Sequence, residues 1–333
     1  MSKAHKPVSS LDEAKAMIRK QYGDGAVMTD EDAPENIDVI PTGCMAIDYV
    51  LGCGGLPRGR IIEVYGGESS GKSSTCLFLA GEVQRSGGVV AYLDVENAYD
   101  RSYANLLGVD TANLLLSQPA TLEETFDIIR AYVETNSVDL IIVDSVAAMT
   151  PKAELEEEDM LKDTVALQAR LLGRGLRILT GPIGRSKTVV MFINQTRTNV
   201  GVMYGPKDTT PGGKALKFFA SVRLNVKRVA KIENTAKEHI GNTLSVTGVK
   251  NKTGAPSRSA EFDLYFGEGV DVYTDILTYG VKMGIVTLTG NTYSYGDKKL
   301  GVGKEKAKAL LKEDEEVFNK IKKDVYDAQG ATK

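Results

Sequence analysis

The chain has 333 residues, 42% hydrophobic and 26% charged, and its 41 basic and 44 acidic side chains leave a net charge of −3. At roughly 150 residues per domain, this length predicts about two domains and excludes a small disulfide-stapled scaffold. No stretch approaches the roughly 20 apolar residues that span a bilayer, and the N-terminus lacks the apolar segment of a signal peptide. We therefore expect a cytoplasmic protein without a membrane partner.

The first predicted element is an amphipathic helix that begins after Ser10 and ends before Gly23. Residues 10–13 fit a capping box, and apolar side chains follow at helical spacing. The polar, proline-containing segment 30–36 is typical of a linker. We expect residues 1–36 to form a helix and linker, with the helix packed either on a neighbouring subunit or on the chain's own larger domain.

Short β-branched segments alternate with helical patterns between residues 37 and 270. This alternation, with near-continuous apolar strands, predicts an α/β domain with a mostly parallel, buried central sheet covered by helices. The predicted strands are Ile61–Tyr65, Val89–Asp94, Leu114–Ser117, Leu140–Asp144, Val189–Ile193, Ser221–Val226 and Leu244–Lys250, and the predicted helices are Lys72–Ser86, Leu122–Thr135 and Thr164–Leu179.

Residues 271–333 differ in composition from the preceding region. They are rich in tyrosine at first and then rich in lysine, with a helical pattern from Lys304 to Ala328. We assign them to a small C-terminal α+β domain.

The strongest motif is a complete GxxxxGK[ST] between a predicted strand and a predicted helix. Glycines at these positions let backbone N–H groups and the helix N-terminus point at phosphate oxygens. Lys72 is expected to reach the β- and γ-phosphates of ATP, and Ser73 to ligate Mg²⁺. The candidate nucleotide-binding residues of this phosphate-binding loop are Gly66, Gly67, Glu68, Ser69, Ser70, Gly71, Lys72, Ser73 and Ser74.

Acidic residues follow two of the predicted strands. Asp144 ends an apolar strand at the carboxyl edge of the sheet, where ligands of open α/β sheets bind, so it is a second candidate Mg²⁺ ligand. The strand Val89–Asp94 leads into Glu96, which we take as the candidate general base for ATP hydrolysis. The residues alone leave Asp94 open as an alternative base.

Gln195 follows another predicted strand and is placed to contact the γ-phosphate. Beyond it lies a long loop rich in glycine, threonine and lysine, a length typical of functional or disordered segments. This loop lies inside a block, residues 182–231, that holds ten basic residues and one acid, a net charge of +9. Such a block is either a solvated face or a footprint for phosphates.

Together these residues resemble the bacterial RecA recombinase family from about Ser10 to Leu311. The motifs that carry the resemblance are Gly66–Ser73, Asp94–Tyr103, Val143–Glu154, Phe192–Gln195, Thr209–Leu224 and Val249–Pro256. It implies a RecA-like P-loop core, and a DNA-dependent ATPase that polymerises on single-stranded DNA as a helical filament. Such a protein pairs the strand with homologous duplex DNA and exchanges strands in recombinational repair. It also implies a part in the SOS response through a LexA-type repressor.

The resemblance further implies roles for individual residues. Asp100 and Tyr103 contact the adenine, Lys250 and Lys252 reach ATP across the subunit interface, and Phe218 couples nucleotide state between subunits, although a plain core Phe218 fits the sequence equally well. The implied DNA-binding residues are Arg170, Arg177, Arg197, Thr198, Asn199, Val200, Gly201, Lys207, Gly212, Gly213 and Lys214.

The sequence also departs from the family pattern. The segment 156–163, which corresponds to a first DNA-binding loop, is more acidic than expected and lacks glycine, and Thr198 and Asn199 replace a more basic pair. Met160, Leu161 and Val165 are candidates to wedge between bases. These departures are compatible with a divergent or phage-encoded member. A ring-forming RecA-like ATPase or helicase is the main alternative function; a small-molecule kinase or a non-hydrolysing DNA scaffold are others.

Overall fold

The computed structural model describes residues 10–23, 26–27, 37–157, 165–198 and 208–331. The chain divides into two units, residues 1–37 and 38–333. The smaller unit contains helix α1 (Leu11–Tyr22), the helix predicted from the sequence. The Ser10 side chain accepts a hydrogen bond of 3.2 Å from the backbone N–H of Glu13, as expected for a capping residue.

The larger unit is built on one sheet whose described part has nine strands in the order β13-β12-β11-β10-β3-β7-β6-β4-β5. From β10 to β5 every neighbouring pair is parallel, and β11, β12 and β13 add antiparallel strands at one side. The predicted mostly parallel sheet is therefore confirmed. The strands are β3 (Ile61–Gly66), β4 (Val90–Asp94), β5 (Leu115–Ser117), β6 (Leu140–Asp144), β7 (Val189–Gln195), β10 (Val222–Glu233), β11 (His239–Asn251), β12 (Ser259–Tyr265) and β13 (Gly269–Val270).

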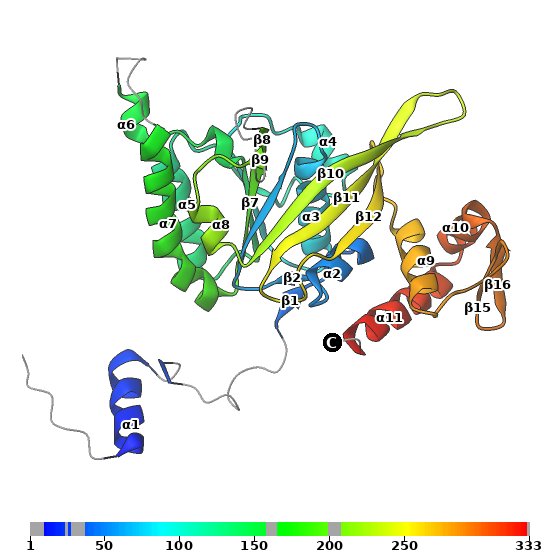
Figure 1. The fold of residues 1–333 in the computed structure, drawn as a ribbon, viewed down its shortest axis with the longest axis horizontal. Helices are drawn as coiled ribbons and strands as arrows, with labels where there is room; N and C mark the ends of the chain where they lie inside the picture. Colours follow the sequence, from blue (N-terminus) through cyan, green and yellow to red (C-terminus); the bar gives the residue numbers. More distant parts are fainter. Residues whose placement is uncertain (1–9, 24–25, 28–36, 158–164, 199–207, 332–333) are drawn as a thin grey trace, which may run out of the picture. The chain divides into compact units, whose positions relative to one another are not determined.

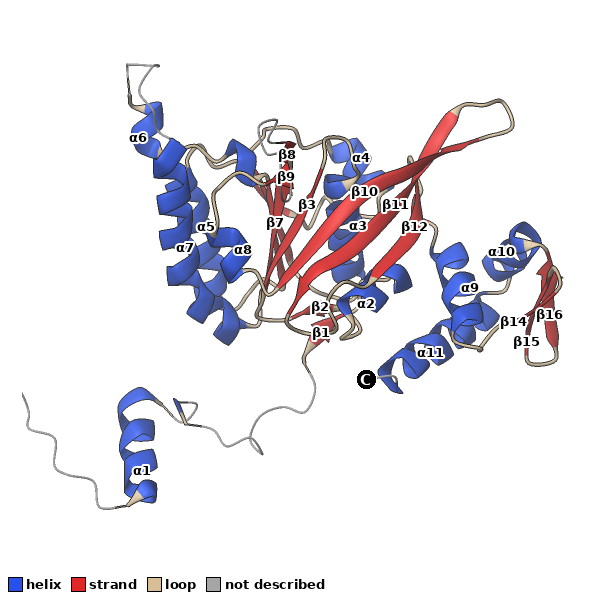
Figure 2. Cartoon of the chain, viewed as in Figure 1, coloured by secondary structure: helices blue, strands red, loops and turns tan. Residues whose placement is uncertain are grey.

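Helices cover both faces of this sheet (Figure 1, Figure 2). One face packs against α2 (Met45–Leu51), α3 (Lys72–Arg85) and α4 (Arg101–Leu106), and the other against α5 (Leu122–Thr135), α7 (Val165–Ser186) and α8 (Ala215–Phe219). Central strands such as β3 and β6 are buried along their whole length. This double burial explains why their sequences are largely apolar rather than alternating, with Glu63 of β3 as a buried exception.

Short elements complete the larger unit. They are β1 (Val39–Ile40), β2 (Leu56–Pro57), the 3₁₀ turn η3 (Val146–Ala148), α6 (Lys152–Leu155), β8 (Arg197–Thr198) and β9 (Asp208–Thr209). Within the part of the chain that the structure describes, no helix is long and apolar enough to cross a membrane.

Four predicted elements differ from the observed ones. Strands β10 and β11 run several residues beyond their predicted ends and form a hairpin that projects past the sheet (Figure 1); its exposed, mostly polar side chains lack the alternation that marks a strand. Helix α7 continues through Pro182 to Ser186, because Leu179 and Ile183 on its inner face remain buried. The predicted helix 304–328 is two helices, interrupted at Asp314, whose carboxylate caps the second by accepting from the N–H of Val317 at 3.1 Å.

The C-terminal elements form a small α+β module, as predicted. It consists of α9 (Val272–Lys282), the three-stranded sheet β14 (Thr287–Thr289), β15 (Thr292–Tyr295) and β16 (Lys298–Val302), and the helices α10 (Lys304–Glu313) and α11 (Glu315–Ala331). The module meets the core at α2. Asp275 of α9 accepts the backbone N–H groups of Met45 and Ala46, and Tyr326 of α11 donates its hydroxyl to Asp48 at 2.9 Å.

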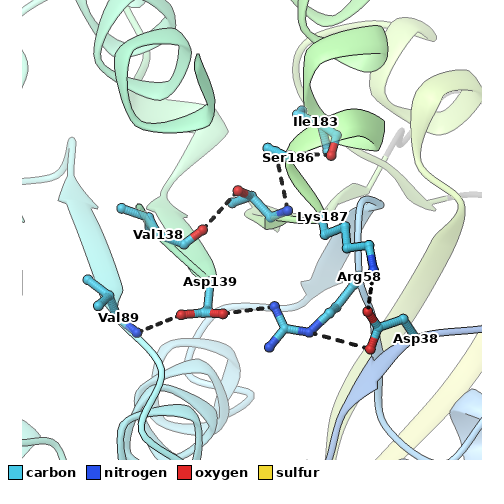
Figure 3. A network of polar contacts seen from close by, with 9 residues as sticks. Asp38, Arg58, Val89, Val138, Asp139, Ile183, Ser186 and Lys187 are labelled. Atoms are coloured by element: carbon cyan, nitrogen blue, oxygen red, sulfur yellow. Dashed lines mark hydrogen bonds and ion pairs between the residues drawn. The ribbon is translucent and has the colours of Figure 1, made fainter. Parts of the chain in front are cut away.

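Ion pairs join the amino ends of the parallel strands (Figure 3). Arg58 lies between two carboxylates, with Nη1 2.8 Å from Asp139 and Nε 3.7 Å from Asp38. Asp139 also accepts the N–H of Val89 at 2.9 Å, and Lys187 is 3.0 Å from Asp38. This edge of the sheet is thus fixed by charge pairs, whereas the opposite, carboxyl edge carries the candidate site.

Candidate nucleotide-binding and DNA-binding site

The phosphate-binding loop connects the carboxyl end of β3 to the N-terminus of α3. Gly71 adopts a left-handed conformation, and a Cβ at this position would lie 2.6 Å from Leu244. A Cβ on Gly66 would lie 2.1 Å from the carbonyl oxygen of Val226. Only glycine fits either position, so the loop approaches β10 and β11 closely while Gly67, Glu68 and Ser69 stay exposed.

Lys72, Ser73 and Asp144 lie together at this edge. Lys72 is buried and donates to the carbonyl oxygen of Gly67 at 2.7 Å; burial lowers the pKa of its amino group, and the nearby carboxylate of Asp144 opposes that shift. Asp144 ends β6, and burial raises its pKa, whereas hydrogen bonds from Ser73 and Tyr92 act against this rise. The Tyr92 hydroxyl is 2.7 Å from Asp144 Oδ2. The arrangement places the hydroxyl of Ser73 and the carboxylate of Asp144 near the amino group of Lys72.

The two candidate bases have different surroundings. Asp94 is buried, and its oxygens accept from the N–H groups of Ala98 (3.0 Å) and Tyr99 (3.1 Å) and from Gln118 Nε2 (3.0 Å). Glu96 is exposed at the same edge and accepts from the hydroxyl of Ser145. Asp94 is therefore occupied in holding the loop after β4, and Glu96 is the accessible carboxylate.

Gln195 is the last residue of β7 and reaches the same cluster. Its Nε2 is 3.3 Å from Oε1 of Glu96, so the predicted sensor and the predicted base contact each other directly. Thr196, the next residue, donates its N–H to the carbonyl of Gly66 at 3.0 Å. The chain that leaves β7 is thereby attached to the first residue of the phosphate-binding loop.

The residues assigned to the adenine lie at the start of α4. Asp100 caps this helix by accepting the N–H of Tyr103 at 3.0 Å, and the Tyr103 hydroxyl is 2.8 Å from Ser74 Oγ. Ser74 belongs to α3, so this contact fixes Tyr103 beside the phosphate-binding loop. The structure thus places Tyr103 beside the helix that follows the phosphate-binding loop, with Asp100 bonded to the backbone of Tyr103.

Lys250 and Lys252 lie elsewhere. Lys250 pairs in register with Arg223, near the amino end of β10, and its Nζ donates to the carbonyl oxygens of Lys217 (2.7 Å) and Phe218 (2.9 Å) of α8. No hydrogen bond among the described residues joins either lysine to the phosphate-binding loop of its own chain. Phe218 itself is 70% exposed, so it is not a core residue of this chain.

The described DNA-binding candidates lie on α7 and before α8. Arg170 and Arg177 are exposed on α7, as is Lys214 before α8. Gly212 and Gly213 have φ values of +80° and +72°, and a Cβ on Gly212 would lie 2.5 Å from Leu172 of α7. Arg197 and Thr198 form β8, which pairs with Thr209 and Asp208 of β9.

The remaining DNA-binding candidates lie outside the described residues or beyond what is described of their side chains. Asn199, Val200, Gly201 and Lys207 fall in the gap between residues 198 and 208, and Met160 and Leu161 in the gap between 157 and 165. The backbone of Val165 begins α7.

Several residues of the site were missed by the sequence reasoning. Lys227 and Arg228 line a cavity of about 640 Å³ beside Gly67–Ser70 and Thr196; the sequence marked them only as members of the +9 block. Arg174 is exposed on α7 between Arg170 and Arg177, at spacings of four and three residues that a helical wheel would have found. Ser145 and Asn194 have no local signal beyond following or preceding a candidate residue.

Comparison with known proteins matches this architecture along nearly the whole chain. Residues 9–271 match the RecA N-terminal domain and residues 274–330 the RecA C-terminal domain. Curated relatives called Protein RecA include that of Chlorobaculum tepidum, 48% identical over 93% of this chain and 90% of the relative. That of Wolinella succinogenes is 48% identical over 97% and 92%, and that of Helicobacter acinonychis 50% identical over 91% and 88%.

A solved structure shares the fold. The crystal structure of the RadB recombinase matches with a TM-score of 0.51 and 21% sequence identity, over 69% of this chain and 98% of that chain. The identity is too low to carry more than the fold, but the curated relatives are far closer in sequence. This chain belongs to the RecA family of DNA-dependent ATPases and recombinases.

Proposed function

We propose that this protein polymerises on single-stranded DNA as an ATP-bound helical filament, pairs the strand with homologous duplex DNA and exchanges strands in recombinational repair. The carrying observation is that Lys72, Asp144 and Glu96 meet at one sheet edge with Gln195, the residue from which the chain leads towards Gly212–Lys214. A nucleotide-sensing group thus directly precedes the segment that bears DNA-binding candidates.

Phosphate recognition relies on the loop backbone and Lys72. The N–H groups of Gly67–Ser73 and the N-terminus of α3 bind the phosphate oxygens, and the amino group of Lys72 neutralises the β- and γ-phosphates. Asp100, Tyr103 and Ser74 hold the adenine end. Lys250, whose amino group is bonded to carbonyl oxygens of α8 rather than to its own phosphate-binding loop, and Lys252 contact the nucleotide of the adjacent subunit, and Phe218 packs against that subunit.

The donor set fits Mg²⁺. Ser73 and Asp144 offer two oxygen ligands, and no group of three or more His, Cys, Asp or Glu side chains in the described ranges could hold a metal ion alone. Mg²⁺ characteristically takes few protein oxygens and completes its shell with phosphate oxygens and water. When bound here, the ion neutralises charge on the β- and γ-phosphates.

Hydrolysis uses Glu96 as the base. Glu96 accepts a proton from the attacking water, while Ser145 and Gln195, both bonded to its carboxylate, orient it. Gln195 also contacts the γ-phosphate, a contact that is lost when the phosphate leaves. ATP therefore favours the DNA-gripping state as a ligand that binds one conformation better than the other.

DNA is held through its backbone. Arg170, Arg177, Arg197 and Lys207 supply charge, with Lys214 and the loop residues Thr198, Asn199, Val200, Gly201, Gly212 and Gly213 beside them. Such contacts are sequence-tolerant and salt-sensitive, so base pairing does the sequence reading. Residues 1–36 serve subunit packing, 37–270 form the ATPase core and 271–333 the C-terminal domain. We further propose that the filament promotes the SOS response through a LexA-type repressor.

The test is Mg²⁺-dependent ATP hydrolysis with and without single-stranded DNA at two salt concentrations, for the wild type and Glu96→Gln. We expect strong stimulation by DNA that weakens at high salt, and loss of hydrolysis in Glu96→Gln with DNA binding retained. Glu134→Gln, the same change at an exposed position of α5, is the control and should hydrolyse ATP like the wild type. Hydrolysis that ignores DNA would contradict the proposal and favour a general P-loop ATPase.

A further inference from the structure

A buried carboxamide joins the nucleotide sensor to the DNA-binding segment. Asn194, one residue before Gln195, is fully buried. Its Nδ2 is 3.1 Å from Glu63 Oε1 and 3.2 Å from the carbonyl oxygen of Pro211, and its Oδ1 accepts the N–H of Gln195 at 3.0 Å. The Asn194 side chain is therefore bonded both to Gln195, where the chain leaves β7, and to Pro211, where the chain comes back to the sheet.

The orientation of this carboxamide is determined by its partners. Its NH₂ group faces two acceptors and its oxygen faces a donor, so a flipped amide would place oxygen against the carboxylate and the carbonyl. Buried polar groups that lose their partners cost free energy, so the amide resists rotation.

Glu63 gives Asn194 a fixed anchor. Its carboxylate lies on β3 with no exposed surface and is paired with Arg223, whose Nε is 2.5 Å from Oε2. The Arg223 guanidinium in turn lies over the ring of Tyr65, 4.4 Å from its centroid. A charge buried with its partner cannot shift without uncovering an unpaired charge, so Glu63 holds Asn194 against the central sheet.

Pro211 directly precedes DNA-binding candidates that pack against α7. Gly212 and Gly213 follow directly, and a Cβ on either would lie 2.5 Å from Leu172 or 3.0 Å from Ala169 of α7. The segment Pro211–Lys214 is thus packed closely on the helix that carries Arg170. Interfaces packed this tightly shift as a unit rather than deform gradually.

We propose that Asn194 is a positioning residue that couples Gln195 to the segment Pro211–Lys214, with Glu63 as its anchor, so that the affinity for single-stranded DNA depends on the bound nucleotide. This inference rests on the proposed function and adds the residue that connects its two sites. Asn194 touches neither nucleotide nor DNA; it acts through Gln195 and Pro211.

The test measures the dissociation constant for a fluorescent single-stranded oligonucleotide in the presence of a non-hydrolysable ATP analogue and of ADP. The ratio of the two constants is the coupling factor, which in allosteric proteins commonly lies at about 5–150. In Asn194→Asp we expect the factor to fall towards one, because an oxygen then replaces Nδ2 and faces the two acceptors, Glu63 and the carbonyl of Pro211. Binding of a fluorescent ATP analogue without DNA should stay within about twofold of the wild type.

A double variant separates coupling from folding. Asn194→Asp with Glu63→Gln exchanges the carboxamide and the carboxylate, keeps the net charge and restores a hydrogen bond between positions 63 and 194, but leaves the Pro211 carbonyl without its donor. Arg223 then keeps only a neutral partner at position 63, so we expect the double variant to melt above Asn194→Asp but below the wild type, with the coupling factor still lost. Asn242→Asp, at a buried asparagine of β11 bonded to His239, is the control and should keep the factor.

Two results would overturn the inference while leaving the proposed function intact: a wild-type coupling factor in the double variant, or a factor that recovers in proportion to melting temperature across the variants. Hydrogen exchange of backbone amides in the wild type provides a second test of the coupling. The ATP analogue alone should slow exchange at Gly212–Lys214, and unchanged exchange there would also overturn it. If the wild type failed to bind single-stranded DNA both with the ATP analogue and with ADP, the proposed function itself would fail, and this inference with it.

Discussion

Two regions of this molecule bury carboxylates, and their neighbours differ in kind. In the central sheet, Asp144 lies beside Lys72 at the carboxyl edge, and Glu63, inside β3, is paired with Arg223 of β10. At the junction of α2 and α9, the direct hydrogen-bond partners of Asp48 and Asp275 are neutral: backbone N–H groups and the side chains of Thr42, Tyr326 and Cys44. Burial raises the pKa of Asp48 to about 6 and that of Asp275 to about 7.

The comparison shows that burial alone does not mark a catalytic acid. Cations beside a buried carboxylate favour its ionised form, which can ligate a metal or anchor a network. At the junction, hydrogen bonds from neutral donors offset only part of the desolvation cost, so the raised pKa values of these carboxylates make stability depend on pH. The partners of each acid, rather than its depth, therefore separate the chemical site from the structural one.

The largest effect is expected on the rate of ATP hydrolysis when a buried carboxylate of the candidate site is removed. Asp144→Asn removes a proposed Mg²⁺ ligand, and we expect ATP turnover to fall by about 100-fold or more, as for other losses of transition-state charge stabilisation. Asp48→Asn makes the same change in the junction and should keep turnover per folded molecule within about twofold. Steady-state hydrolysis under saturating Mg²⁺ and single-stranded DNA measures both, and equal losses in the two variants would refute the contrast.

The next largest expected effect is on the free energy of unfolding, through the ion pair between Glu63 of β3 and Arg223 of β10. Arg223→Leu leaves Glu63 buried and unpaired, and breaking a buried pair in this way costs about 3–5 kcal/mol. Adding Glu63→Gln to Arg223→Leu removes the orphaned charge and should recover a large part of the loss. Urea unfolding followed by circular dichroism provides the free energies; a single variant as stable as the wild type would show that Glu63 does not depend on Arg223.

Stability should depend on pH through the junction acids. Their pKa values are higher in the folded state than the value of about 3.9 in an unfolded chain, so between these values the folded state binds more protons. Their contribution is fully present below about pH 4 and is lost as pH rises through about 6 for Asp48 and 7 for Asp275. We expect the free energy of unfolding to fall over this range because of them.

Asp275→Asn should flatten this profile. An asparagine has no charge to bury, so the stability of the variant relative to the wild type should improve from pH 5 to about pH 7 and level off above it, by an amount of the order of a few kcal/mol. Denaturation at four pH values measures the difference. Asp110→Asn, at an exposed turn, is the control, and profiles for Asp275→Asn and wild type that run parallel would count against the assignment.

Local signals account for what the sequence could predict. The apolar run Leu140–Val143, the GxxxxGK[ST] motif and the capping box at Ser10 each specify structure within a few residues, and the strands, the phosphate-binding loop and α1 follow them. The site's acids were predictable because parallel strands end at a common edge.

Long-range contacts account for what it could not. Asp275 reaches Met45 across 230 positions, and Asn194 reaches Pro211 across a segment without regular apolar spacing. In neither pair does the local sequence around one residue indicate its partner. The choice between Asp94 and Glu96 was open for the same reason, because only the fold shows that Ala98, Tyr99 and Gln118 occupy the oxygens of Asp94.

The smallest expected effect comes from the amino edge of the sheet (Figure 3), where ion pairs are direct but partly solvated. Arg58→Ala removes contacts to Asp139 and Asp38, and because the Arg58 side chain is 26% exposed, we expect a loss of about 1 kcal/mol that shrinks in high salt. Arg130→Ala, which breaks the exposed pair with Glu134 on α5, should leave the melting temperature unchanged. Melting curves at low and high salt measure both. A salt-independent loss in Arg58→Ala would mean that the arginine acts by packing rather than by charge, and that its ion pairs add little to the stability of this edge.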